Sequence, residues 1–296
     1  MSRPFAERIA AAPISWGVCE VPGWGWQYDV ATVLGQMREL GLAATEFGPE
    51  GFLPDPGGDR AKVLAEHGLR AVGGFVPVVL HEPGHDPVPA VRVALEAFVE
   101  SGASTLVLAA ATGRDGYDER PELDEDGWAA LLSTLDRLAR AAAELGVAAT
   151  LHPHVGTMVE NAAEVRRVLD ASDIGLCLDT GHLLIGGADP VALARDHADR
   201  VRHVHLKDVD AGRAASVRAG RIGYADAVRE GLYRPLGQGD VDIAAIVTSL
   251  ERAGYDGWYV LEQDTILAGP PTGVADEPQT DVRASVAHLR AVAGVS

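Results

Sequence analysis

This 296-residue chain is poor in cysteine and has no long hydrophobic run. Its two cysteines, Cys19 and Cys177, are too few for a disulfide framework and match no cysteine-based zinc motif. No segment approaches the roughly 18 apolar residues that a membrane-spanning helix needs. The first ten residues also lack the apolar core of a signal peptide. We therefore expect a cytoplasmic protein without disulfides.

Lysine is scarce as well. Of the 25 basic residues only Lys62 and Lys207 are lysine, so a lysine within a functional motif is notable. The 43 acidic residues bring the net charge to −18, which disfavours attraction to nucleic acid or anionic membranes. A hydrophobic fraction of 47% is typical of a globular protein rather than a disordered one.

Short apolar segments alternate with longer amphipathic segments along the chain. Several expected helices are followed directly by glycines that suit a left-handed C-cap. Eight strands, each followed by a helix, predict a single-domain (β/α)8 TIM barrel over residues 1–296. The rival fold, a doubly wound sheet, needs a glycine-rich phosphate turn after an early strand, and none is present. The expected strands are 8–16, 43–47, 70–79, 105–110, 147–154, 174–179, 201–207 and 257–262, and the expected helices are 30–40, 59–67, 88–101, 122–145, 162–171, 190–198, 243–253 and 279–293.

Two connections are longer than usual, at about 17–28 and 208–239. Both follow expected strands, so we place them on the C-terminal face of the barrel, where the active sites of this fold lie. Long loops at that position are candidate lids.

Polar side chains collect at the ends of the expected strands. Residues two apart in a strand share a face, so His152 and His154 point the same way, as do His203, His205 and Lys207. Five of the ten histidines fall at the ends of three consecutive strands. The other polar residues at strand ends are Glu46, Asp179, His182 and Glu262.

So many ionisable groups are costly to bury unless a cation pairs with several of them at once. A ligand set of Asp, Glu and His without thiolate suits Mn²⁺, Co²⁺, Zn²⁺ or Mg²⁺. Cys177 precedes Asp179 by two residues and is expected in the core below it. The sequence therefore predicts one divalent metal ion at the C-terminal face.

Several motifs resemble the sugar phosphate isomerase/epimerase superfamily, whose members share the xylose isomerase-like TIM barrel. The resemblance covers nearly the whole chain and is densest from His152 to Asp264. Within the superfamily the motifs are most similar to those of the inosose dehydratases. The motifs are APISW from residue 12, HPHVGT from 152, LDTGH from 178, HVHLKD from 203, GQGDVD from 237 and LEQD from 261.

The resemblance implies four metal ligands, since the superfamily binds one divalent ion through Glu, Asp, His and Glu. By position these fall on His152, Asp179, His205 and Glu262. The first is a departure, because the sugar epimerases have Glu where this chain has His152. An elimination, which needs one base and one acid, fits the remaining residues better than a two-Glu epimerisation. Spacing alone does not decide between His152 and His154.

The resemblance further implies a metal-dependent lyase that dehydrates an inosose, 2-keto-myo-inositol, through a metal-bound enediolate. The ion is expected to be Mn²⁺ or Co²⁺ ahead of Mg²⁺ or Zn²⁺. The candidate acids and bases are Lys207, His154, Glu46 and His182, and the candidate substrate contacts are Trp16, His182, His154 and Lys207. A buried Lys207 beside a metal is expected to have a lowered pKa, unless it forms a salt bridge with Asp208 or Asp179. Glu46 could instead orient a ligand.

Other readings remain open. One is a ketose 3-epimerase or inosose isomerase on the same barrel, and another is a dehydratase or C-glycoside-cleaving relative with a different substrate. A third is a non-catalytic sugar-binding barrel or partner subunit. An abasic-site endonuclease is disfavoured because it needs additional histidine ligands and a phosphate-binding surface. We expect a small polyol or ketose as partner, with no nucleic acid or membrane, and homo-oligomerisation is compatible with the sequence.

Overall fold

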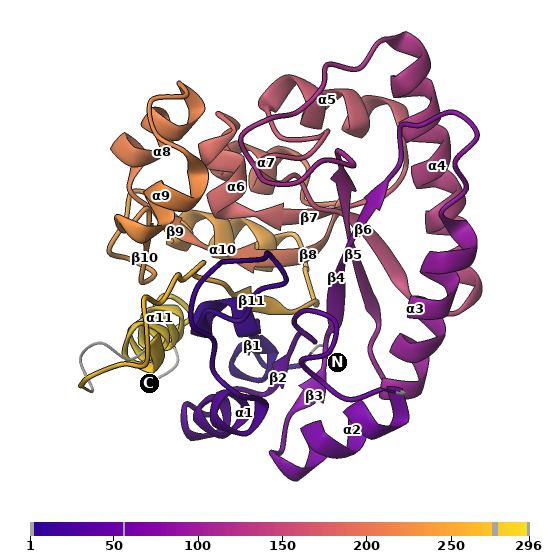
Figure 1. Ribbon diagram of the computed structural model, residues 1–296. Coiled ribbons are helices and arrows are strands. Elements are labelled where there is room, and N and C mark those ends of the chain that lie inside the picture. Colours follow the sequence, from indigo (N-terminus) through magenta and orange to yellow (C-terminus); the bar gives the residue numbers. More distant parts are fainter. Residues whose placement is uncertain (1–2, 56, 274–277, 295–296) are drawn as a thin grey trace.

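The protein was analysed as a computed structural model that describes residues 3–55, 57–273 and 278–294. Its main sheet is parallel, in the order β3-β2-β1-β11-β8-β7-β6-β5-β4. β3 and β4 are consecutive in the chain, on either side of Val72, and pair with β2 and β5 respectively. The sheet therefore closes into a barrel (Figure 1). Its strands are β1 (Ile9–Ala11), β2 (Ala44–Thr45), β3 (Arg70–Ala71), β4 (Gly73–Val79), β5 (Thr105–Ala111), β6 (Ala148–Leu151), β7 (Gly175–Asp179), β8 (Val201–Leu206) and β11 (Tyr259–Leu261).

Helices cover the outside of this barrel (Figure 1). Their inner faces are apolar: α4, for example, buries Trp128, Leu131, Leu135 and Leu138 at the three- and four-residue spacing of an amphipathic helix. The helices that follow the barrel strands are α1 (Val30–Glu39), α2 (Gly57–Glu66), α3 (Val88–Ser101), α4 (Glu125–Glu144), α5 (Ala162–Ala171), α6 (Thr180–Ile185), α7 (Pro190–Asp196), α10 (Ile243–Arg252) and α11 (Pro278–Val292). In the described part of the chain, no helix is long and apolar enough to cross a membrane.

The predicted TIM barrel is confirmed, and each expected strand and helix has a counterpart close to its predicted position. The glycines expected to end helices, among them Gly41, Gly102 and Gly146, adopt the positive φ angles of a left-handed cap. The first strand is shorter than predicted. It ends at Ala11, and the short 3-10 helix η2 (Pro13–Trp16) follows, because Pro13 cannot donate a backbone hydrogen bond to the sheet.

The connection at 208–239 contains β9 (Asp208–Val209), α8 (Ala211–Arg218), α9 (Tyr224–Arg229) and β10 (Tyr233–Arg234). The two strands pair antiparallel, with Tyr233 opposite Val209. The buried carboxylate of Asp208 accepts backbone N–H groups from Gly237, Gly239 and Val241 at 2.8–3.0 Å. A Cβ on Gly239 would lie 2.3 Å from Asp208 Oδ1, so this contact requires glycine. Asp208 thus fixes the end of the connection to its beginning.

Candidate metal centre

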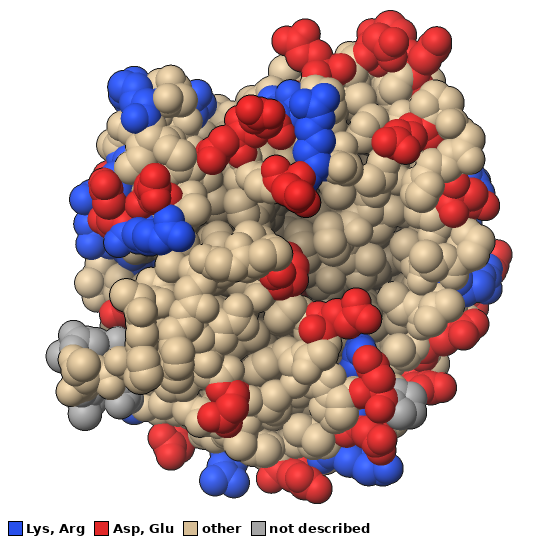
Figure 2. All heavy atoms as spheres, in the orientation of Figure 1, with Lys and Arg blue, Asp and Glu red and all other residues tan. Residues whose placement is uncertain are grey.

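A cavity of about 680 Å³ opens at the carboxyl ends of the barrel strands. Figure 2 shows a hollow near the centre of this face with acidic side chains around it. Its polar lining contains most of the residues predicted from the sequence together with acidic groups near the mouth. The ionisable side chains among its lining residues are Cys19, Glu20, Glu46, Glu50, Asp55, Arg60, Tyr117, His152, His154, His205, Lys207, Glu262 and Asp264.

Asp179 uses its two carboxylate oxygens for different purposes. It is the last residue of β7 and the N-cap of α6, where Oδ1 accepts the backbone N–H of His182 at 2.8 Å. Oδ2 is turned to the barrel interior, 3.1 Å from His152 Nε2 and 3.5 Å from His205 Nδ1. The local fold therefore fixes this carboxylate and directs one oxygen toward the histidines.

His205 lies between two groups of carboxylates. Its Nε2 lies 2.9 Å from Glu46 Oε1, which also accepts from His203 Nε2 at 2.7 Å. Its Nδ1 is 3.3 Å from Glu262 Oε2 on the other side of the ring. Burial would raise the pKa of Glu46, but His205 and His203 hold it well below its usual range. Glu46 is therefore an ionised group that accepts hydrogen bonds from both imidazoles.

The two histidines that follow β6, His152 and His154, differ in their surroundings. His152 faces Asp179, whereas His154 directs Nδ1 to the Val155 carbonyl oxygen at 2.7 Å and lies against the His182 ring, with centroids 3.7 Å apart. Burial lowers the pKa of His152 to about 3 and that of His154 to about 4. Both imidazoles are consequently neutral at neutral pH, the form that a metal ligand requires.

Lys207 supplies positive charge among the carboxylates. Its Nζ lies 2.6 Å from Asp264 Oδ1, 3.0 Å from Glu262 Oε2 and 3.5 Å from Asp179 Oδ2. Burial alone would lower the pKa of Lys207, but these three carboxylates raise it well above its usual value. These carboxylates therefore keep Lys207 in its charged form. The salt bridge to Asp179 is present, while Asp208 binds the 237–241 turn instead.

The donor set fits a divalent cation. One ligand atom from each of Asp179, His205 and Glu262 lies within 4.8 Å of the others, and all three residues are buried. His205 Nδ1, which faces both carboxylates, has no hydrogen-bond partner among the described residues. Burial raises the pKa of Glu262 to about 7, so a cation at this position would relieve the cost of its charge. His152 Nε2 lies 3.1 Å from Asp179 Oδ2, the carboxylate oxygen that also faces His205.

Two expected substrate contacts lie elsewhere. Trp16 is absent from the cavity lining; it is fully buried, and its Nε1 donates to Gln36 Oε1 on α1 at 2.7 Å, because the turn at Pro13 directs it into the core. His182 is also absent from the lining and lies behind Lys207, with its Nε2 3.0 Å from Nζ. The indole that does line the cavity is Trp24, whose Nε1 donates to the Thr265 carbonyl oxygen.

Sequence reasoning missed a network behind Lys207. Asp264 accepts from Lys207 Nζ through Oδ1 and from the Tyr224 hydroxyl through Oδ2 at 2.5 Å. Tyr233 joins through a 2.8 Å hydroxyl contact with Tyr224. The signal for Asp264 was its spacing of two residues from Glu262, which puts both on one face. Tyr224 and Tyr233 belong to the 208–239 connection and carry no such signal.

Aromatic side chains form part of the wall. Tyr117 stacks on His154 with ring centroids 5.6 Å apart and contacts the edge of Trp24. The ring centroid of Phe75 lies 5.8 Å from those of His152 and His154. Gly156 permits the approach of the segment around Tyr117, because a Cβ there would lie 2.6 Å from the Tyr117 backbone. The wall therefore presents ring faces beside the histidines.

Similarity to known proteins extends over most of the chain. A family model described as "Xylose isomerase-like TIM barrel" matches residues 34–292. An inosose dehydratase of Geobacillus kaustophilus is 35% identical over 91% of this chain and 91% of its own. A rhizopine catabolism protein of Rhizobium meliloti is 37% identical over 90% of this chain and 84% of its own. A solved structure of the IolI protein with a bound zinc atom has a TM-score of 0.70 at 14% identity, covering 97% of this chain and 98% of that one, which shows the shared fold.

Proposed function

The chain belongs to the xylose isomerase-like TIM barrel family, and we propose that it dehydrates 2-keto-myo-inositol with a divalent metal held by His152, Asp179, His205 and Glu262. It is an enzyme of the dehydratase or isomerase type. The observation that supports the ligand assignment is the buried His205 Nδ1, which makes no hydrogen bond among the described residues and lies 3.5 Å from Asp179 Oδ2 and 3.3 Å from Glu262 Oε2. We further propose Mn²⁺ or Co²⁺ as the ion and the cytoplasm as the location, since both cysteines are free.

An uncharged polyol fits the charges of the cavity better than a phosphorylated sugar. Six acidic residues line the cavity, namely Glu20, Glu46, Glu50, Asp55, Glu262 and Asp264, against the two basic residues Arg60 and Lys207. Both basic side chains are already paired, Arg60 with Asp55 and Lys207 with Asp264. A phosphate would therefore enter a negative field with no unpaired cation in the described lining. The ring faces of Tyr117 and Trp24 suit the C–H face of a cyclic polyol.

The residues that line the cavity divide the proton transfers between them. A bound divalent ion would polarise the ketone of the substrate as a Lewis acid and so acidify the adjacent C–H. His154 directs Nδ1 to the Val155 carbonyl, which leaves Nε2 to accept that proton. Lys207 holds a proton on Nζ and would donate it to the departing hydroxyl, which leaves as water. Glu46 accepts from His205 and His182 contacts Lys207, and both are assigned positioning roles.

The test is turnover of 2-keto-myo-inositol by metal-depleted protein reloaded with Mn²⁺ or Co²⁺, followed by the ultraviolet absorbance of the diketone. We expect turnover that depends on the ion. Glu262→Gln and His205→Ala should lose both metal retention and activity, whereas Glu66→Gln on the exposed face of α2 should lose neither. No turnover with either ion would refute the dehydratase assignment. An epimer seen by NMR without diketone would replace it with an inosose isomerase.

Substitution of the two lysines tests whether Lys207 is the general acid. Lys207→Met should lower kcat while metal content stays close to the wild-type value, because Lys207 is not a ligand. Lys62→Met is the matched control, since Lys62 is exposed on α2 and pairs only with Asp59 among the described residues. Unchanged kcat in Lys207→Met would remove Lys207 from the mechanism.

A further inference from the structure

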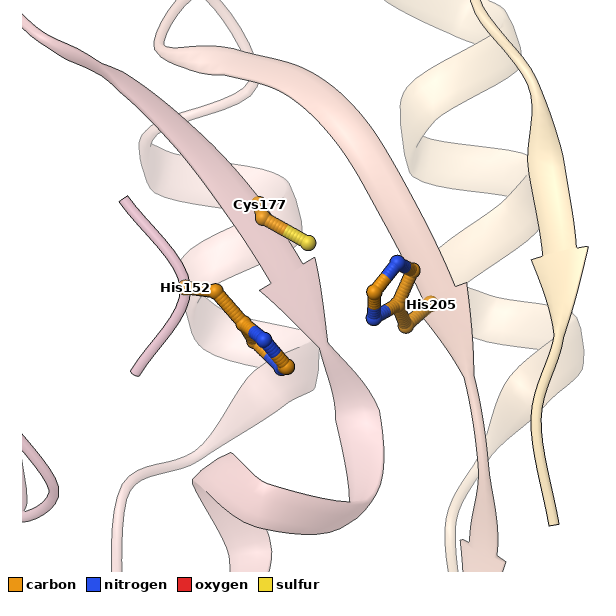
Figure 3. A group of neighbouring side chains, drawn as sticks. All are labelled: His152, Cys177 and His205. Carbon is orange, nitrogen blue, oxygen red and sulfur yellow. The ribbon is translucent and has the colours of Figure 1, made fainter. Parts of the chain in front are cut away.

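Cys177 lies in the barrel interior beneath the proposed ligands. It belongs to β7, two residues before Asp179, and its side chain is fully buried. Its Sγ and one ring nitrogen from each of His152 and His205 all lie within 4.8 Å of one another. Figure 3 shows the thiol and the two imidazole rings turned toward the same space. These three side chains form a donor cluster that contains sulfur and no carboxylate.

The Nδ1 atom of each histidine is available to a further ligand, and that of His205 also faces Asp179 and Glu262 at 3.5 and 3.3 Å. His152 Nδ1 and His205 Nδ1 are buried and lack a hydrogen-bond partner within the described ranges. Their Nε2 atoms face Asp179 and Glu46 respectively. A buried polar atom without a partner is costly and marks a position where a ligand can bind. The cysteine is also unpaired, because Cys177 forms no disulfide.

The two overlapping donor sets prefer different cations. Thiolate and imidazole are the ligands of Zn²⁺ and other thiophilic ions, whereas carboxylate-rich sets also accept harder ions such as Mn²⁺ and Mg²⁺. His205 belongs to both observed groups, and the proposed ligand set adds His152 through its contact with Asp179. Both histidines line the cavity, and the fully buried Cys177 lies beneath them.

We propose that Cys177, His152 and His205 form a second cation site, selective for Zn²⁺ and related thiophilic ions, whose occupation excludes the catalytic ion. Binding exchanges the thiol proton, which leaves to solvent, for a bond from sulfur to the metal. Exclusion follows because one imidazole nitrogen cannot serve two ions. This second part rests on the proposed ligand set, while the thiolate site itself does not. Zinc would then inhibit an enzyme that works with Mn²⁺ or Co²⁺.

Cadmium is the probe, because a thiolate–Cd²⁺ bond has a charge-transfer absorption in the ultraviolet. Titration of metal-depleted wild-type protein should give this difference band, and Cys177→Ser and Cys177→Ala should lose it with about tenfold or weaker Cd²⁺ affinity. The matched control is Cys19→Ser, which removes the other buried cysteine and should keep the band. Absence of the band in wild type, persistence in the Cys177 variants or loss in Cys19→Ser would each overturn the site. Thermal melting without metal verifies that each variant is folded.

A competition experiment needs no cysteine variant. Bound Mn²⁺, followed by electron paramagnetic resonance, should be released from wild-type protein by about one equivalent of Cd²⁺. Simultaneous binding of both ions would overturn the exclusion. In Glu262→Gln, Mn²⁺ binding should weaken while the Cd²⁺ band persists, and loss of both would overturn a separate thiolate site. A failure to dehydrate inosose leaves all of these spectra unchanged, so the two proposals fail independently.

Discussion

Glu46 Oε1 lies 2.9 Å from His205 Nε2, on the opposite side of the imidazole from Asp179 and Glu262. Because the pKa of Glu46 is held well below its usual range, the carboxylate is an acceptor and Nε2 is the donor. The bond therefore leaves Nδ1 as the nitrogen that would lose its proton and bind a metal ion. It directs Nδ1, and not Nε2, toward the two carboxylates.

Glu46→Gln should weaken metal binding without unfolding the protein. The amide keeps the size of the side chain but removes the charge that orients His205 and His203. We expect a loss of about 10- to 100-fold in Mn²⁺ affinity by isothermal titration calorimetry. An affinity within about twofold of wild type would contradict the orienting role.

A pair of substitutions can show whether His152 or His154 is the metal ligand. His152→Ala should lose bound metal, since His152 contacts Asp179, whereas His154→Ala should keep the metal and lose turnover. Metal content after gel filtration and kcat with added Mn²⁺ are the two measurements. The reverse pattern would assign the ligand to His154.

Metal binding should release a proton near neutral pH. Burial would lower the pKa of His205, but Cys177, Glu262 and Glu46 raise it well above its usual value, so the metal-free protein holds a proton on this ring. A metal needs the neutral imidazole, and affinity should therefore rise with pH, by about tenfold per unit for one proton, until the pKa of His205 is passed. Calorimetry in two buffers of different ionisation enthalpy counts the protons. A binding enthalpy independent of buffer would contradict a protonated His205.

Asp208→Asn should destabilise the protein while sparing the metal site. The Asp208 carboxylate accepts hydrogen bonds from the backbone N–H groups of Gly237, Gly239 and Val241. The amide of Asn has only one acceptor oxygen, so it can accept only some of these hydrogen bonds. Hydrogen bonds to a buried charged group contribute about 2 kcal/mol each, so a loss of that order is expected from urea denaturation. Asp242→Asn, at the exposed N-cap of α10, is the control and should cost less. Unchanged stability in Asp208→Asn would show that the turn holds without its charge.

The barrel itself could be predicted because its signals are local. Short apolar segments indicated the strands. Glycines such as Gly41 and Gly146, which adopt positive φ angles, indicated where helices end. The clustering of the polar strand ends followed as well, since carboxyl ends of parallel strands meet on one face. Asp179, His205 and Glu262 accordingly lie together.

Other features depend on which way a side chain turns, and a sequence pattern does not determine this. Trp16 lies in the expected first strand, but the η2 turn at Pro13 sends it into the core. The raised pKa of Lys207 depends on Asp264, a carboxylate whose orientation is set by Tyr224 from a distant connection. Contacts across 40 residues of sequence have no local periodicity to reveal them.

The hydrogen bonds of Asp208 close the 208–239 connection at its base. The two ends of the 208–239 connection meet at the Asp208 carboxylate, so the connection forms a closed loop on the barrel. It also carries Tyr224, which supports Asp264 and through it Lys207. Substitutions in this connection can therefore change the surroundings of Lys207 while the residues that would hold the ion stay the same.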